Sequence, residues 1–196
     1  GLNSAGLGLA INGITSTRDG WGTLNSPFHL RCYHILRSHD IEAAAAVITA
    51  TPRACSANYL LAQPPAQVLD VEAAPHAVHR LTWNDGIVIH ANHFIAPESA
   101  GIEEPPNPYR PMSCRRSDRL HELIRRNLPA SIEDLQRYLQ DHGQPQRASI
   151  CRHHNPADPP AEQYRTVTSV VMDLDERTIY LTDGPPCQND YKRYSL

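Results

Sequence analysis

Cysteine and histidine are the residues of this chain best suited to metal and redox chemistry, and their spacing decides whether they can cooperate. The five cysteines are Cys32, Cys55, Cys114, Cys151 and Cys187. They are widely spaced and form no CxxC pair of the kind found in zinc and redox sites. Among the eleven histidines, His90 with His93 and the adjacent His153 and His154 are grouped, but such neighbours point apart on an extended strand. Zinc needs three or four converging ligands, so we expect no metal and no cofactor.

The bulk properties exclude several classes of protein. A chain of 196 residues fits one domain, residues 1–196, within the usual range of roughly 100–200 residues. A net charge of −3 without a long basic run argues against nucleic acid as a partner. No apolar stretch approaches the ~20 residues that cross a bilayer, so we expect no membrane partner. The odd, scattered cysteines favour reduced thiols and a cytoplasmic location.

The first half of the chain predicts a strand, two helices and a meander. Residues 7–12 alternate between apolar and small or polar side chains, which indicates a strand. After a Gly/Thr/Ser loop at residues 19–26, helical spacing follows from about Pro27 to Ser38. Asp40 can cap a second helix that ends near Ala50. Apolar runs with turn residues between them, such as Asn84-Asp85, then predict the strands Ala57–Ala62, Gln67–Glu72, Ala77–Trp83 and Gly86–His90.

The second half predicts a long loop, two helices and a hairpin. Five prolines within Pro97–Pro111 indicate a loop that borders a cleft or covers it. Helices are expected at Arg115–Asn127 and at Ser131–His142, the second with Ser131 as its cap and Gly143 as its stop. Thr166–Leu174 and Thr178–Thr182 then read as a hairpin. Strands and helix pairs segregated in this way favour an α+β fold.

Four segments together carry a family resemblance. Gly1–Asn12 is similar to the G-x-N-x-x-G-x-x-x-x-x-N segment of cysteine N-terminal-nucleophile hydrolases. Ile89–His93, Ser113-x-x-Arg116-x-x-Arg119 and Ser149–Arg152 follow in the order typical of the isopenicillin N acyltransferase branch, also called the acyl-coenzyme A:6-aminopenicillanic acid acyltransferase family. The similarity extends from Gly1 to about Pro186. It implies a four-layer αββα sandwich and an amide or thioester acyl-transfer enzyme.

In this family a precursor cleaves itself, so that a cysteine becomes the N-terminal residue and supplies both the thiolate and the amine base. The resemblance places that cysteine before Gly1, and none of the five cysteines lies in a matching segment. We therefore expect a processed or truncated chain that is inactive alone. An N-terminal fragment or subunit that carries the nucleophile is a further expected partner, beside a small-molecule amide or acyl thioester substrate.

The resemblance also assigns site residues. Acyl transfer needs donors for the oxyanion that develops on the attacked carbonyl, and an asparagine amide is a suitable donor. Asn92 matches the family position of that donor. Asn12 matches an asparagine that orients the substrate carbonyl or the catalytic amine, and Arg152 matches an arginine that favours thiolate over thiol. His93 and Asn3, in the same motifs, are assigned to substrate binding.

The assignments of Asn92, Asn12 and Arg152 each have a structural alternative. Asparagines such as Asn92 and Asn12 commonly serve in turns, and Arg152 could form an ion pair. For Arg116 and Arg119, three residues apart on a helix, we favour a structural clamp onto neighbouring carboxylates or helix ends.

The substrate stays open at this level. Ala74 stands where the enzyme that handles penicillin has a serine, and Gln163 falls near that enzyme's substrate-binding arginine, so both departures argue against a β-lactam substrate. We expect hydrolysis of, or transfer from, a small N-acyl or peptide-like compound. The alternatives are a bile-salt-hydrolase-like or ceramidase-like amidase, and a ligand-binding protein that keeps the fold without catalysis.

Overall fold

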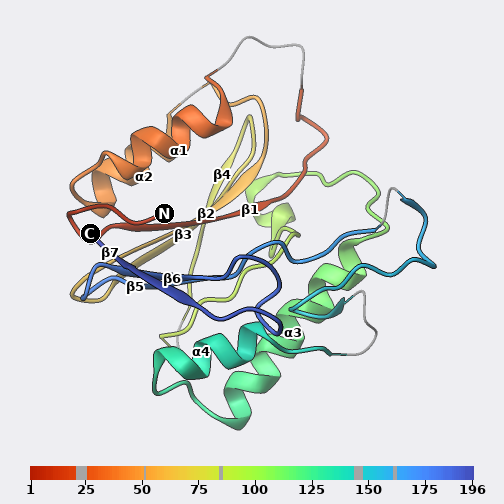
Figure 1. Ribbon diagram of the computed structural model, residues 1–196. Coiled ribbons are helices and arrows are strands. Elements are labelled where there is room, and N and C mark those ends of the chain that lie inside the picture. Colours follow the sequence, from red (N-terminus) through yellow and green to blue (C-terminus); the bar gives the residue numbers. More distant parts are fainter. Residues whose placement is uncertain (21–25, 51, 84–85, 144–147, 161–162) are drawn as a thin grey trace. The chain divides into compact units, whose positions relative to one another are not determined.

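The computed structural model describes every residue of the chain except 21–25, 51, 84–85, 144–147 and 161–162 (Figure 1). The described residues form two compact units, Gly1–Arg110 with Leu196, and Pro111–Ser195. Each unit has helices and an antiparallel sheet, which confirms the expected α+β class. None of the described helices is long and apolar enough to cross a membrane. Most of the loop expected at residues 19–26 and the turn at Asn84-Asp85 lie outside the described residues.

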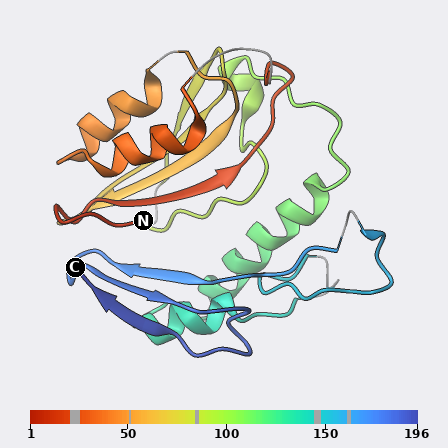
Figure 2. The ribbon, with the colours of Figure 1, turned by 45° about the horizontal axis from the view of Figure 1, so that its top comes forward.

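The first unit is built on a sheet with strand order β1-β2-β3-β4, in which neighbouring strands are antiparallel. Its strands are β1 Gly8–Gly13, β2 Ala57–Gln63, β3 Gln67–Ala73 and β4 Val78–Leu81. Helices α1 Phe28–Leu36 and α2 Ile41–Thr49 connect β1 to β2 and cover one face of the sheet (Figure 2). The predicted strand, helix pair and first three strands of the meander are thus confirmed.

Apolar side chains at alternate strand positions form the core beneath these helices. The cluster comprises Leu7, Leu9, Ile35, Ile41, Ala44, Ile48, Ala57, Tyr59, Leu61, Val71 and Ala73. Ala44 of α2 has no exposed surface, and its small side chain lets the helix approach the sheet closely. Burial of each large member contributes about 1.5–3 kcal/mol. One face of every central strand is therefore committed to packing, and only the other face can carry a site.

Specific hydrogen bonds define both ends of α2. At its start, the Asp40 carboxylate accepts a hydrogen bond from the Ala43 N–H at 2.8 Å, which confirms the predicted cap. At its end, the buried Arg31 guanidinium donates to the carbonyls of Val47 at 2.5 Å and Ala50 at 2.9 Å. The last carbonyls of a helix have no partner inside it, so Arg31 satisfies them from α1.

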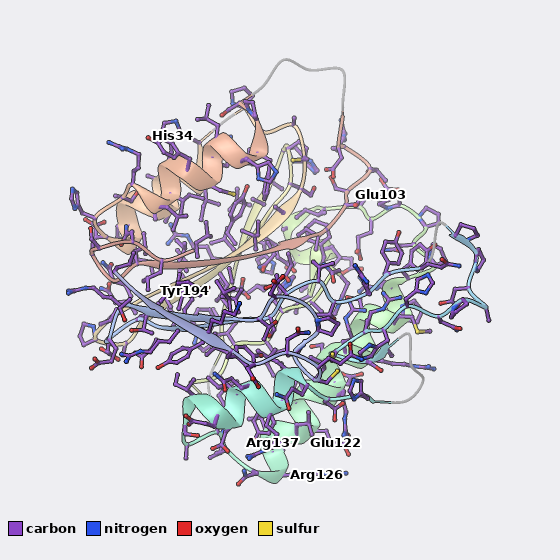
Figure 3. The ribbon with its side chains drawn as sticks, viewed as in Figure 1. His34, Glu103, Glu122, Arg126, Arg137 and Tyr194 are labelled. Atoms are coloured by element: carbon purple, nitrogen blue, oxygen red, sulfur yellow. The ribbon has the colours of Figure 1, made fainter. Side chains whose placement is uncertain are left out.

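The second unit contains helices α3 Arg110–Arg126 and α4 Ile132–Leu139. Its sheet has the order β5-β6-β7, with strands Val170–Asp173, Thr178–Leu181 and Lys192–Ser195. The Ser131 hydroxyl accepts from the Asp134 N–H at 3.2 Å, as the predicted cap requires. On the surface of the helices, Arg126 pairs with Glu122 (Figure 3). Arg137 pairs with Asp134. The predicted hairpin is confirmed as β5 and β6.

Several boundaries were predicted wrongly. The segment Gly86–His90 is not a strand, because side-chain contacts rather than a backbone ladder hold it. The expected loop at residues 97–111 contains a short 3-10 helix, Pro97–Ala100, and the start of α3. Proline is tolerated in the first helical turn, so Pro111 does not delay α3. Helix α4 ends at Leu139, earlier than the expected His142, and β7 was not predicted.

Candidate functional site

A row of polar residues crosses the sheet of the first unit, one from each strand. In register, Asn12 of β1 pairs with Asn58 of β2. Asn58 in turn pairs with Glu72 of β3, and Glu72 pairs with His79 of β4. Because strand side chains alternate between faces, this row lies opposite the face that packs against α1 and α2. Asn58 and Glu72 are each 0% exposed, so the row is a buried polar network rather than a solvated edge.

Asn58 links the row to a buried carboxyl group. Its Oδ1 accepts a hydrogen bond from Asn12 Nδ2 at 3.0 Å, and its Nδ2 donates to Asp70 Oδ1. Burial raises the pKa of Asp70, while the Asn58 hydrogen bond acts in the opposite direction. Among the described residues, Asp70 Oδ2 has no hydrogen-bond partner. The chain from Asp70 through Asn58 fixes the orientation of the Asn12 amide.

Glu72 holds the segment that follows the sheet. Its Oε1 accepts from His90 Nε2 at 2.9 Å and from the Ile95 N–H at 2.7 Å. The other ring nitrogen of His90, Nδ1, lies 2.7 Å from the Ala91 carbonyl oxygen and 3.5 Å from Asn12 Nδ2. These contacts replace a strand ladder, which is why this segment is irregular. Glu72 therefore positions residues 90–95 against the end of β1.

The motif segment at residues 90–93 meets β1 at its C-terminal end. Asn92 is exposed, and its Nδ2 donates to the Gly13 carbonyl at 3.2 Å. The ring of His93 stacks on that of His90, with centroids 6.4 Å apart and planes 24° apart. The structure thus brings Asn12, Asn92 and His93 together, although about 80 residues separate the first from the others. Two oriented amides beside a strand end can donate to an anionic oxygen.

Asn3 lies at the N-terminal turn. Its Nδ2 donates to the carbonyls of Leu36 at 3.0 Å and Ser38 at 2.8 Å, and its Oδ1 accepts from the N–H groups of Ala5 and Leu7. These bonds tie the turn before β1 to the end of α1. All four bonds are to backbone groups, so the Asn3 side chain holds this turn in place.

Arg152 belongs to the second unit, whereas Asn12 and Asn92 belong to the first. Its guanidinium carbon lies 5.3 Å from the centroid of the Tyr164 ring, a cation–π arrangement. Its backbone N–H donates to Thr166 Oγ1 at 2.9 Å. Burial lowers the pKa of Arg116, and the positive charge of Arg152 lowers it further. Arg152 is thus held by packing and backbone bonds beside a second cation.

Arg119 forms the structural clamp that we favoured from sequence. Its Nε and Nη2 donate to the two oxygens of Asp141 at 3.0 and 2.7 Å, and its Nη1 donates to Glu122 at 2.8 Å. The Arg119 hydrogen bonds hold the pKa of Asp141 below its ordinary value. A bidentate pair of this kind fixes geometry, so Arg119 anchors the segment after α4 to α3.

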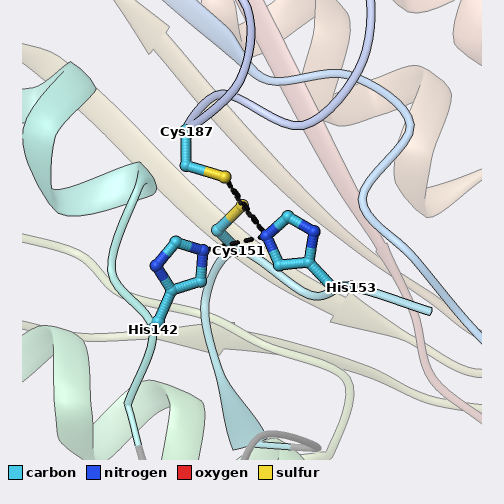
Figure 4. Close-up of side chains that lie close together, drawn as sticks. All are labelled: His142, Cys151, His153 and Cys187. Atoms are coloured by element: carbon cyan, nitrogen blue, oxygen red, sulfur yellow. Dashed lines mark hydrogen bonds between the residues drawn. The ribbon is translucent and has the colours of Figure 1, made fainter. Parts of the chain in front are cut away.

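The five cysteines are all unpaired thiols. Burial raises the pKa of Cys32 and of Cys55, and it raises the pKa of Cys151 to about 11. A thiol with a raised pKa is a poor nucleophile at neutral pH, so these three do not resemble catalytic cysteines. Cys151 and Cys187 lie with His142 and His153 in a cluster of the second unit that could hold a metal (Figure 4).

Sequence reasoning missed the supporting residues Asn58, Asp70 and Glu72. The sequence signal that could have revealed them is a polar residue inside a strand with an apolar residue on each side, as in Leu69-Asp70-Val71-Glu72-Ala73. A buried carboxylate in a strand needs partners, and this pattern therefore indicates a network on the face away from the helices. The identity of those partners depends on strand register, which cannot be read from the sequence alone.

Comparison with known proteins agrees with the motifs. A scan against protein families matches residues 1–187 to the family described as acyl-coenzyme A:6-aminopenicillanic acid acyl-transferase. No curated protein matches the chain. The matched part includes Gly1–Arg110 of the first unit, the second unit as far as residue 187, and all of the motif segments. The chain therefore belongs to the acyl-coenzyme A:6-aminopenicillanic acid acyl-transferase family, a family of acyltransferase and hydrolase type.

Proposed function

We propose that the protein transfers an acyl group from an amide or thioester, either to water or to an amine, through an N-terminal cysteine that precedes Gly1. The observation that carries this proposal is the meeting of Asn12 and Asn92 at the C-terminal end of β1, where Asn92 donates to the carbonyl of Gly13. A small N-acyl or peptide-like compound is the proposed substrate. Self-cleavage of a precursor and a four-layer αββα sandwich are parts of the same proposal.

Asn92 is proposed as the oxyanion donor. When the thiolate attacks the substrate carbonyl, the C=O π electrons move to oxygen and the new C–S bond forms, so negative charge develops on that oxygen. The Asn92 amide is exposed, which makes it accessible to a substrate, and its bond to Gly13 sets its direction. A donor oriented before the reaction costs little reorganisation and lowers the barrier by about 2.7–4 kcal/mol.

Asn12 is proposed to orient the substrate carbonyl or the catalytic amine. Its amide is held by Asn58, which is held by the buried Asp70. Collapse of the tetrahedral intermediate breaks the C–N or C–S bond of the substrate, and the leaving group takes the proton that the amine removed from the thiol. A fixed asparagine beside that amine keeps it aligned for both proton transfers.

The remaining assignments belong to this proposal as well. His93, stacked on His90, is proposed to contact the acyl or leaving group. Asn3 is proposed to serve substrate binding through the turn that it holds. Arg152 is proposed to favour the thiolate by its positive charge. An N-terminal fragment or subunit would supply the cysteine.

The decisive experiment uses the complete reading frame, as wild type and with each cysteine upstream of residue 1 changed to alanine. Intact mass and N-terminal sequencing should show that only the wild type cleaves itself to begin with cysteine. That protein should then release acid from N-acyl amides or acyl thioesters of graded chain length, and a preference for long chains would favour the amidase alternative. If no form begins with cysteine and none turns over an acyl compound, the proposal is wrong and a ligand-binding role replaces it.

A further inference from the structure

Two histidines and two cysteines of the second unit converge on one point (Figure 4). His142 follows α4, Cys151 and His153 lie in the segment before β5, and Cys187 follows β6. One ligand atom from each residue, a ring nitrogen or a sulfur, lies within 4.8 Å of every other. Three separate segments of chain therefore contribute to a set of borderline-soft donors without a carboxylate.

The S–S, S–N and N–N separations approach the edges of a tetrahedral zinc site, and the two shortest are about 0.4 Å below them. Zinc bonds of about 2.3 Å to sulfur and about 2.0–2.1 Å to nitrogen imply edges of about 3.8 Å for S–S, 3.5 Å for S–N and 3.3 Å for N–N. The two sulfurs are 3.6 Å apart, and His153 Nε2 lies 3.7 Å from Cys151 Sγ and 3.1 Å from Cys187 Sγ. The Nε2 atoms of His142 and His153 are 2.9 Å apart.

Hydrogen bonds alone do not account for this arrangement. His153 Nε2 approaches three polar atoms, one nitrogen and two sulfurs, yet a ring nitrogen carries either one hydrogen or one lone pair. A disulfide does not account for it either, because the sulfurs are 3.6 Å apart and a covalent S–S bond is about 2.05 Å. A single cation bound by all four atoms explains every contact at once.

The backbone around the cluster is fixed independently of any ion. The Cys151 N–H donates to the Asp141 carbonyl at 3.0 Å, and Ser149 Oγ donates to the Gly143 carbonyl at 2.8 Å. These bonds place His142 beside Cys151, while Arg119 clamps Asp141 to α3.

The Cys187 turn is preorganised as well. Gly184 has φ of +119°, and a Cβ there would lie 2.6 Å from Asn189 Nδ2. Only glycine fits such a position without strain. Asn189 Nδ2 in turn donates to the Pro185 carbonyl at 2.9 Å, which closes the turn around Cys187.

We propose that His142, Cys151, His153 and Cys187 bind one Zn²⁺ ion in a closed, structural site. Thiolate and imidazole donors in a tetrahedron select zinc, and four protein ligands leave no open position for catalysis. Binding forms two Zn–S and two Zn–N bonds and releases the two thiol protons to solvent. The ion would join the end of α4, the segment around Arg152 and the turn after β6. The acyl-transfer proposal does not depend on it.

The test measures metal directly, so that it does not depend on activity. The complete protein, purified in reducing buffer without added metal or chelator, should contain about one zinc per chain by elemental analysis. After chelation and reloading with Co²⁺, it should show the visible bands of tetrahedral cobalt and a thiolate charge-transfer band. Loss of a group that only orients a metal ligand by a hydrogen bond costs about 10–100-fold in metal affinity. Loss of a ligand through His142→Ala or Cys187→Ser should therefore cost at least about as much.

Matched controls separate ligand loss from general damage. His121→Ala removes an exposed histidine of α3, and Cys55→Ser removes an exposed cysteine of the first unit. Both should keep the zinc content and affinity of the wild type. The proposal is overturned if wild type binds no zinc when Zn²⁺ is added, if His142→Ala and Cys187→Ser bind it as tightly as the controls, or if peptide mapping finds a Cys151–Cys187 disulfide in place of the metal.

Discussion

At the scale of single residues, the exposed amide of Asn92 is the group whose removal should affect chemistry most and stability least. Its Nδ2 donates to the Gly13 carbonyl at 3.2 Å, and its side chain is exposed rather than part of the core. Asn92 therefore differs from Asn58, which is fully buried and supports the network.

Asn92→Ala should lower kcat about 10²–10³-fold with little change in KM, because an oxyanion donor acts mainly in the transition state. The measurement is steady-state kinetics of the self-processed protein on its best acyl substrate. Asn127→Ala, which removes an exposed asparagine after α3, should leave both constants unchanged. A raised KM with unchanged kcat would instead assign Asn92 to substrate binding.

Asp70 should make the folded state less stable as pH rises, because its buried environment raises its pKa. Burial is the largest cause and raises the pKa of Asp70, and the like charge of Glu72 raises it as well. The hydrogen bond from Asn58 and the charge of His90 each lower the pKa of Asp70 by less than burial raises it. The folded state therefore holds the Asp70 proton to higher pH than the unfolded state does. The stabilisation from this group is fully present below the ordinary aspartate pKa of about 3.9. It is lost as pH rises through the raised pKa of the folded state, with a slope of at most about 1.4 kcal/mol per pH unit.

Asp70→Asn cannot titrate, so its unfolding free energy relative to wild type should increase as pH rises from about 4 and then level off. Urea unfolding at closely spaced pH values measures this difference. Asp118→Asn, at an exposed position of α3, is the matched control. A difference that falls with rising pH would show that the pKa of Asp70 is lowered rather than raised.

At the scale of elements, two buried arginines hold the end of α2. Arg31 donates to the carbonyls of Val47 and Ala50, and Arg53 donates to those of Thr49 and Ala74 at 2.8 Å each. Burial and the charge of Arg31 lower the pKa of Arg53. Together they satisfy carbonyls that a helix end leaves without partners, where a positive charge is also favoured.

Arg31→Met should reduce the unfolding free energy by about 2–4 kcal/mol, because several hydrogen bonds to a charged group are lost and buried carbonyls remain unpaired. Denaturant unfolding followed by circular dichroism measures the loss. Arg37→Met, at an exposed position just after α1, should change stability by less than about 0.5 kcal/mol. Equal effects of the two changes would show that the hydrogen bonds of Arg31 to the end of α2 do not stabilise the fold.

At the scale of the whole molecule, the chain divides into two compact units, and the proposed zinc site lies within the second. A structural zinc site contributes its binding free energy to the fold around it. Loss of the metal should therefore destabilise the second unit and leave the stability of the first unit unchanged.

Chelation of zinc should speed hydrogen exchange at residues 141–143, 149–153 and 184–189 and leave β2 and β3 unchanged, since those strands belong to a separate core. Exchange measured by mass spectrometry on the metal-loaded and chelated protein makes the comparison. Uniform acceleration in both units would contradict a local structural role, and no acceleration anywhere would contradict a structural role of any kind.

Much of the local structure could be predicted from the sequence, because caps, turns and strand alternation depend on residues that are close together in the chain. The Asp40 and Ser131 caps, the alternation in β1 and the β5–β6 hairpin all follow from spacing over a few positions. The sequence failed for β7, whose residues Lys192–Ser195 are all exposed and lack apolar alternation. It also failed for Gly86–His90, where the pattern of a strand is present but the contacts of Glu72 replace the ladder.

The motifs identified Asn12 and Asn92 from sequence. Their meeting at the end of β1, and their support by Asn58, Asp70 and Glu72, became clear only from the fold. The same holds for the cluster of His142, Cys151, His153 and Cys187. Their spacing matches no short metal motif, so local pattern predicted no metal. Which distant segments come together depends on strand register and packing across the whole chain, and no local spacing records that.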